Sequence, residues 1–275
     1  MAGEGKVWAR IMAPLSGGEG DRHVVAAGAT LAEPFGAELC CVHAPPDVAD
    51  LIPWMGDGFM GGVQASAVDA IREAASEGAR SAESTANASP YAHKSFRSLS
   101  SPVWAALALQ CRVSDVVVFD DASAKGRGPL AETFQQIVAD EQRPTLVARP
   151  GFSVGGVVAL AWDGGKEASR AVRTAVPLLE KASRVLILSA PQAASRQFEP
   201  TALQGYLADR GIASETQSVE GGGDAAPKLL KAAVAAGANL LVAGAFGHPR
   251  LQEFVFGGAT RTFFQASEPS LFLSH

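Results

Sequence analysis

The sequence predicts an α/β fold made of two tandem units, each a mostly parallel sheet of about five strands with helices on both faces. Two observations predict it. Short apolar segments alternate with segments of helical periodicity, and the order of these segments in the first half of the chain recurs in the second. Such alternation is typical of parallel strands joined by right-handed crossovers, whose helices cover the two faces of the sheet.

The internal repeat indicates where the elements lie. The first half has a strand over 10–15, a Ser-Gly-Gly turn, a helical stretch to about residue 36 and a strand over 38–43. The second half has a strand over 157–162, an Asp-Gly-Gly turn, a helical stretch to about residue 182 and a strand over 184–189. Because each half carries one complete series, we expect one unit over 1–150 and another over 151–275.

The later segments of the two halves also correspond. Apolar runs over 114–119 and 238–243 are the expected fourth strands, and those over 144–149 and 269–274 are the expected last strands. The segment over 166–181 predicts a helix, because apolar residues recur on one face of it at helical spacing. These residues are Ala168, Ala171, Val172, Ala175, Val176, Leu178 and Leu179.

Composition narrows the class of protein. Of 275 residues, 47% are apolar and 19% are charged, which favours packed cores over disorder. A net charge of −5 without a run of Lys or Arg argues against a broad nucleic-acid-binding face. The N-terminus lacks the apolar core of a signal peptide, and no segment is long enough to span a bilayer. We therefore expect a cytoplasmic protein with reduced, buried cysteines and with neither nucleic acid nor membrane as a partner.

A glycine motif near the C-terminus indicates a chemistry. Gly244 and Gly247 follow an apolar strand-like run, nine residues intervene, and Gly257-Gly258-Ala259-Thr260 then precede a helix-like stretch. Glycines at a strand end let the backbone approach a ligand closely, and a helix start offers unpaired N–H groups with positive dipole charge. This combination suits phosphate oxygens.

With this motif and the repeat, the chain resembles the universal stress protein family, whose nucleotide-binding members carry G-x2-G-x9-G followed by Ser or Thr. Gly258 stands where that hydroxyl residue belongs. The resemblance implies a tandem protein of the bacterial type, with two flavodoxin-like (adenine nucleotide alpha hydrolase-like) units on one chain. It also implies a non-enzymatic stress-response or regulatory role, an unknown protein partner, and an intramolecular pseudo-dimer through the strands 144–149 and 269–274.

The resemblance further implies that ATP or AMP, with or without Mg²⁺, binds in the C-terminal unit only. The first segment at that site is Ala161-Trp162-Asp163-Gly164, at the end of a strand. The Asp163 carboxylate would accept hydrogen bonds from ribose hydroxyls or a base amine, although an Asp between a strand and a helix is also typical of an N-cap. The backbone of Leu188 and Ser189 would lie along one edge of the adenine.

The glycine motif supplies the rest of the implied site. Gly244 and Gly247 would line ribose and phosphates, and the N–H groups of Gly257, Gly258, Ala259 and Thr260 would bind phosphate oxygens. His248 and Arg250 would add positive charge, unless they are simply solvated loop residues. Glycine at 258 removes one side-chain donor, which is a modest loss beside several backbone donors.

The first unit differs at the matching positions. Ser16 stands where Asp163 does, and Asp120-Asp121 follow the fourth strand in place of the glycine motif. Two carboxylates there would repel a triphosphate unless a cation intervened, so we expect a degenerate site and a role as scaffold or partner surface. The insertion over 45–62, rich in Gly and Pro with several apolar residues, is either an interaction loop or a segment folded onto its own unit.

Two other sequence motifs lack the secondary structure that their functions require. The G-x-G-x-x-G over 56–61 lies inside that insertion, and the G-x-S-x-G over 151–155 leads into a strand rather than a helix. No catalytic or metal-ligating residue is assigned. Two alternatives to nucleotide binding by a regulatory protein remain: a nucleotide-free interaction scaffold of the same fold and, ranked last because no catalytic base is evident, a slow ATPase.

Overall fold

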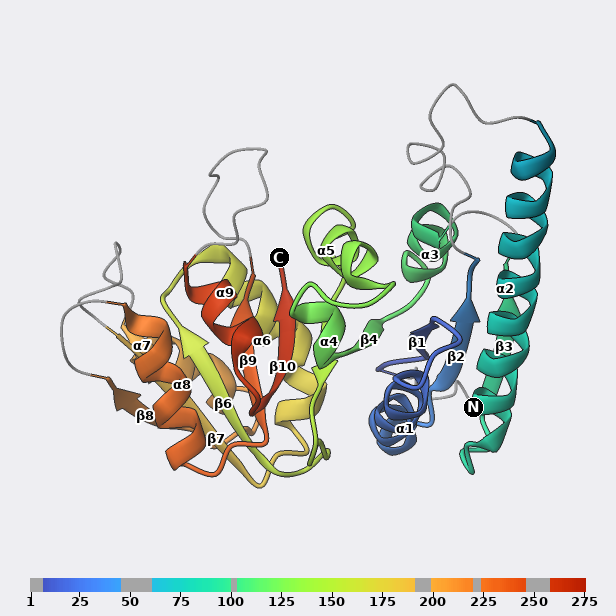
Figure 1. The fold of residues 1–275 in the computed structure, drawn as a ribbon. Coiled ribbons are helices and arrows are strands. Elements are labelled where there is room, and N and C mark those ends of the chain that lie inside the picture. Colours follow the sequence, from blue (N-terminus) through green and yellow to red (C-terminus); the bar gives the residue numbers. More distant parts are fainter. Residues whose placement is uncertain (1–6, 46–60, 100–102, 191–198, 220–223, 246–257) are drawn as a thin grey trace.

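The computed structural model describes residues 7–45, 61–99, 103–190, 199–219, 224–245 and 258–275. Within them, ten strands form one sheet in the order β3-β2-β1-β4-β5-β10-β9-β6-β7-β8 (Figure 1). All neighbouring strands are parallel except β5 and β10, which are antiparallel. The predicted α/β class, with mostly parallel strands and helices on both faces, is confirmed.

The strands recur in the same order in the two halves. The first half contains β1 (Arg10–Leu15), β2 (Glu38–His43), β3 (Lys94–Ser98), β4 (Val116–Asp120) and β5 (Thr145–Ala148). The second half contains β6 (Val157–Trp162), β7 (Arg184–Ser189), β8 (Glu215–Ser218), β9 (Leu240–Gly244) and β10 (Ser270–Ser274). Long buried runs in β1, β2, β4 and β9 reflect strands that are covered on both faces.

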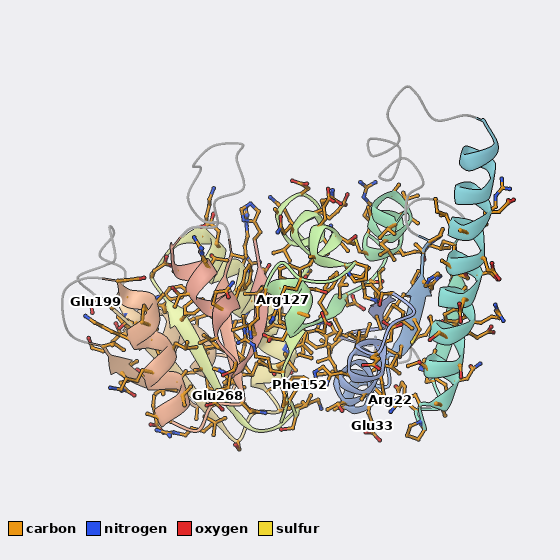
Figure 2. All side chains as sticks on the ribbon, in the orientation of Figure 1. Arg22, Glu33, Arg127, Phe152, Glu199 and Glu268 are labelled. Carbon is orange, nitrogen blue, oxygen red and sulfur yellow. The ribbon has the colours of Figure 1, made fainter. Side chains whose placement is uncertain are left out.

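Two groups of helices cover the two faces. One face carries α1 (Asp21–Ala32), the short 3-10 helix η1 (Glu33–Phe35), α2 (Gly61–Ala88), α6 (Lys166–Leu179) and α7 (Pro200–Ala208). The other carries α3 (Val103–Cys111), α4 (Asp121–Ala124), α5 (Ala131–Ala139), α8 (Ala225–Ala235) and α9 (Gly258–Gln265). Side chains fill the space between these helices and the sheet in both halves (Figure 2).

Adjacent cysteines in β2 illustrate the alternation of a strand between the two cores. Cys41 packs with the α1 side and Cys40 with the α3 side, and both are buried free thiols. Burial raises the pKa of the Cys41 thiol to about 12, so this sulfur stays protonated and unreactive.

The two halves join at the centre of the sheet. Leu146 of β5 lies opposite Phe272 of β10 in an antiparallel register. On one face of this junction the ring of Trp8 stacks on Phe272, with centroids 6.1 Å apart. The last strands of the two units therefore form one continuous sheet with a shared core.

Each half contains one point where the strand order reverses. β1 lies between β2 and β4, and β6 lies between β7 and β9. In open α/β sheets such a switch point leaves a crevice at the carboxyl ends of the strands, where ligands bind. The fold thus offers two equivalent locations for a site, one in each unit.

A few boundaries differ from the sequence-based expectation. The helix expected to end at 181 ends at Leu179, and both last strands begin one residue later than expected. Most of the insertion over 45–62 lies outside the described residues, and α2 begins at Gly61. Among the described helices, none is both long and apolar enough to cross a bilayer.

Candidate functional site

The switch point of the C-terminal unit gathers several predicted residues on one edge of the sheet. Trp162 at the end of β6 pairs in register with Ser189 at the end of β7, and Ala161 pairs with Leu188. On the other side of β6, β9 ends at Gly244. Because these strands are parallel, their carboxyl ends meet at this edge, and the Asp163-Gly164 turn continues from it.

The Asp163 carboxylate is exposed and shapes the turn into α6. Its Oδ1 accepts a hydrogen bond from the Gly165 N–H at 2.8 Å. Gly165 is the N-cap residue of α6, so the N-cap interpretation of Asp163 is wrong by two positions. A carboxylate accepts about four hydrogen bonds, so one backbone partner leaves capacity for a ligand.

Trp162 brings a polar group that sequence reasoning did not use. Its ring packs against the core on the α6 side, and its indole N–H is buried without an acceptor among the described residues. Buried N–H groups in proteins almost always have a partner, and those without one call for an explanation such as a bound ligand or water. Only a backbone role was expected for Trp162 from the sequence.

Gly244 has a packing reason to be glycine. A Cβ at this position would lie 2.6 Å from the Ala168 nitrogen and 2.8 Å from the Glu167 Cβ. The first turn of α6 therefore lies directly on the end of β9. This close approach holds the α6 start beside the switch point, and it explains the glycine without reference to a ligand.

The start of α9 carries the last described part of the glycine motif. The helix begins at Gly258, and the first N–H groups of a helix have no partner within it. Ala259 is exposed, whereas Thr260 is buried, so the Thr260 hydroxyl is turned toward the protein. The remaining predicted residues, Gly247, His248, Arg250 and Gly257, lie outside the described residues.

The switch point of the N-terminal unit is built differently. A cavity of about 390 Å³ lies there, between the β1–α1 turn and the residues that follow β4. The carboxylate of Asp21, buried in the first turn of α1, accepts the Ser16 N–H at 2.9 Å and the Gly17 N–H at 2.7 Å. The donors of this turn are thus occupied by an anion of the chain itself.

The Asp21 side chain is almost completely buried, although it borders the cavity. Burial raises the pKa of the Asp21 carboxyl, although its backbone hydrogen bonds oppose that shift. Burial also lowers the pKa of the neighbouring His43 imidazole, which the Asp21 charge partly counteracts. Helix α2 lies over the turn so closely that a Cβ on Gly17 would lie 2.5 Å from the Gly78 Cα.

The two carboxylates after β4 have separate partners. Asp120 caps α4 by accepting the Ser123 N–H at 2.8 Å, whereas Asp121 forms ion pairs with Arg149 and Lys125. The expectation that both charges would repel a triphosphate is therefore wrong for Asp121, whose charge is compensated by two cations. Asp120 lines the cavity together with Glu19, Asp21 and the cationic Arg127.

Arg149 links the two units through its buried guanidinium. It donates to Asp121 Oδ1 at 2.8 Å in the first unit and to three carbonyls of the second, those of Phe263, Phe264 and Pro269. Burial lowers the pKa of this guanidinium, and the Asp121 carboxylate opposes the shift. The sequence gives no signal for this role, since an Arg between a strand and Pro150-Gly151 resembles an ordinary surface residue.

Among the described residues, no group of three or more His, Cys, Asp or Glu side chains is arranged to hold a metal ion. Positive charge gathers at one further place. A second, more open cavity of about 570 Å³ has Arg143, Arg170, Arg173 and Arg210 in its lining. These arginines come from three separate segments of the chain, so no run of basic residues in the sequence indicates the cluster.

A scan against models of protein families finds no match for this chain, and a search of curated proteins finds none either. Solved structures do match. A universal stress protein from Archaeoglobus fulgidus aligns with a TM-score of 0.65 and 13% identity, covering 96% of this chain and 95% of its own. A functionally unknown protein from Pseudomonas aeruginosa aligns with a TM-score of 0.58 and 12% identity over 98% of this chain and 93% of its own.

A third structure, provisionally assigned to the universal stress proteins and also from Pseudomonas aeruginosa, has a TM-score of 0.59 and 12% identity. It covers 98% of this chain and 94% of its own. These alignments extend over both halves of the chain. At such low identity they show the fold, which is that of universal stress proteins.

Proposed function

We propose that this protein is a tandem protein of the universal stress type that binds an adenine nucleotide in its C-terminal unit and acts in a stress response or its regulation. The observation that carries the proposal is the convergence at the β6–β9 switch point. At the end of β6, the exposed Asp163 carboxylate follows Trp162, whose buried indole N–H has no acceptor among the described residues, and α9 begins in the connection between β9 and β10. The shared fold supports the class of protein.

Each group has a chemical task in this proposal. Asp163 accepts hydrogen bonds from the ribose hydroxyls or the base amine, and the backbone at Leu188 and Ser189 borders the adenine. The N–H groups at the start of α9 bind phosphate oxygens, assisted by the helix dipole. The Trp162 N–H donates to an acceptor of the ligand or to a water bound with it. Mg²⁺, when it accompanies the nucleotide, neutralises phosphate charge.

The N-terminal unit serves as a partner for this site rather than as a second copy. Its turn donors are occupied by Asp21, and Asp120 lines its cavity. A second anion at these donors would have to displace a buried carboxylate. We therefore expect one nucleotide per chain and no catalytic group acting on it.

Calorimetric titration of ATP and of AMP into the purified chain, with Mg²⁺ present, tests the proposal. We expect one site per chain and a loss of about tenfold in affinity for Asp163→Ala, which removes a charged acceptor. Asp209→Ala is the matched control, because this exposed carboxylate lies at the end of α7, outside the site.

A second variant tests the phosphate end. Gly258→Glu places a negative charge at the start of α9, where it favours the helix but repels phosphate. Binding should therefore disappear while the unfolding temperature is retained. If wild-type protein gives neither heat nor thermal stabilisation with millimolar nucleotide, the proposal is overturned, and the chain is better treated as an interaction scaffold. Release of inorganic phosphate during the titration would favour the ATPase instead.

A further inference from the structure

An arginine-lined groove lies between the two units beside α6, and its lining shares no residue with the proposed nucleotide site. Its lining, here called the arginine groove, includes Gln142 and Arg143 from the α5–β5 loop, Arg170 and Arg173 from α6, and Tyr206 and Arg210 from the end of α7. The volume is about 570 Å³. The fold brings together these three segments from both halves of the chain.

The positive charge of the groove is not compensated by its own lining. No Asp or Glu is present among its lining residues within the described part of the chain. Arg143 donates to the Glu141 carbonyl at 3.0 Å, and Arg210 donates to the Tyr206 carbonyl while lying over the Tyr206 ring. These partners are neutral, so they orient the two guanidinium groups without cancelling their charge.

Arg170 and Arg173 have still fewer contacts. Neither side chain forms a hydrogen bond or an ion pair with another described residue, and both are exposed on α6. Two other exposed arginines do have carboxylate partners: Arg112 pairs with Glu141 and Arg184 with Glu215. The nearest carboxylate in sequence to Arg143, that of Glu141, is therefore already engaged by Arg112.

Four guanidinium groups around one groove form a site for an anion. Three of them, those of Arg170, Arg173 and Arg210, have no carboxylate partner among the described residues, whereas Arg143 lies near enough to Glu141 to help lower the pKa of that carboxyl. Guanidinium groups stay charged at physiological pH, and their mutual repulsion is relieved when an anion lies between them. Their planar forks match the oxygens of phosphate and donate to them in pairs. A volume of about 570 Å³ lies within the usual range of small-molecule sites.

We infer that the arginine groove binds a small polyanion that carries at least two phosphate groups, such as a compound with a pyrophosphate moiety. The four arginines are distributed over three segments, which favours an extended ligand over a single phosphate. The chain has a net charge of −5, which argues against a long nucleic acid. The site is independent of the nucleotide site in the C-terminal unit.

Titration of inorganic pyrophosphate into the full chain without Mg²⁺, followed by calorimetry, tests the inference. We expect one site per chain, weakened several-fold when NaCl is raised from about 0.05 M to about 0.3 M, because the groove is open and its charges are screened. The double variant R170Q/R173Q should lose at least about tenfold in affinity. Glutamine is a good helix former, so α6 should persist, and a thermal melt checks this.

Two matched variants separate a site from general attraction. Arg22→Gln removes an exposed arginine from α1 (Figure 2) that is not part of the groove lining, and it should leave pyrophosphate affinity unchanged. Arg170→Lys keeps the charge but loses the paired donors, and its affinity should lie between those of wild type and Arg170→Gln.

The two proposed sites give distinguishable results. Asp163→Ala should leave pyrophosphate binding intact, and R170Q/R173Q should leave AMP binding intact. Pyrophosphate affinity that is unchanged in R170Q/R173Q, or lowered equally in Arg22→Gln, would overturn the inference. Tighter binding of an acidic peptide or a single-stranded oligonucleotide at the same arginines would also overturn it, in favour of a macromolecular partner.

Discussion

The two units have the same topology at their switch points but opposite arrangements of charge. Both turns pass through a left-handed glycine, Gly17 with φ of 85° and Gly164 with φ of 73°. In the first unit the turn closes around the Asp21 carboxylate. In the second unit Ala168 stands at the position that corresponds to Asp21, and the carboxylate of Asp163 is exposed instead.

The same backbone arrangement can therefore form an anion site or lack one, depending on whether a carboxylate of the chain occupies its N–H donors. Backbone N–H donors that meet a buried carboxylate of their own chain are no longer available to a phosphate. Packing adds to the effect, because α2 lies directly on the Gly17 turn at Gly78. The identity of a few side chains thus decides the chemistry of each edge, while the strand order stays the same.

The largest expected effect concerns the residue that joins the two units. Arg149→Met should lower the free energy of unfolding by about 3–5 kcal/mol, because it removes one partner of a buried ion pair and the buried donor that binds three carbonyls. Urea denaturation measures the loss. Arg112→Met, which breaks an exposed pair with Glu141, should leave the midpoint near that of wild type. Equal effects of the two variants would contradict the coupling role of Arg149.

Asp21→Ala removes the carboxylate that distinguishes the first switch point from the second. Two backbone N–H groups lose a buried charged acceptor, so the free energy of unfolding should fall by about 2 kcal/mol. Added inorganic phosphate should then stabilise the variant more than wild type, because the freed donors accept an external anion. Asp163→Ala is the control, with a smaller loss from its exposed position. A variant as stable as wild type would mean that Asp21 does not hold the turn.

The buried His43 beside Asp21 makes stability depend on pH. Its pKa is lowered from 6.5 in the folded protein, mainly by burial, so the unfolded chain binds the proton more readily. Stability is therefore present above pH 6.5 and is lost as pH falls toward the folded pKa. Asp21, whose pKa is raised above 3.8, acts in the opposite sense at lower pH, where the folded state takes up its proton first.

His43→Gln should thus flatten the loss of stability between about pH 7 and about pH 5, measured by urea denaturation at several pH values. His93→Gln is the matched control, because His93 is exposed just before β3 and its ring contacts the Gly36 carbonyl. A profile for His43→Gln that keeps the wild-type slope would show that other groups control the acid sensitivity.

The fold was predictable because its signals are local and repeated. The bounds of β1, β2, β6 and β7 agree with the sequence-based strands, since each is a short apolar run closed by a turn that recurs in the other half. The edge formed by Trp162, Ser189 and Gly244 follows from the same pattern, because parallel strands place their carboxyl ends together.

The side-chain chemistry was less predictable because it depends on contacts between distant segments. Arg149 donates hydrogen bonds to residues more than a hundred positions away, and the sequence around Arg149 does not indicate these contacts. The arginine groove combines four arginines from three segments, two of them from α6. Gly244 shows the reverse problem, since its identity fits a ligand motif but packing against α6 already requires it.

A smaller effect is expected in the C-terminal unit, where Gly258→Ser tests the start of α9. Gly258→Ser supplies the hydroxyl that nucleotide-binding universal stress proteins carry after the motif. One added neutral hydrogen bond to phosphate should tighten nucleotide binding about two- to fivefold, as measured by calorimetry. Serine is also well tolerated at a helix start, so the protein without nucleotide should be as stable as wild type.

Gly205→Ser, at an exposed position of α7 with open space around it, controls for the general effect of replacing a helical glycine. Its nucleotide affinity should equal that of wild type. If Gly258→Ser instead weakens binding, the start of α9 approaches the phosphates too closely for any side chain. The glycine at 258 would then be required for the phosphates to fit at the start of α9. The site would differ from that of nucleotide-binding universal stress proteins at the position where this sequence departs from their motif.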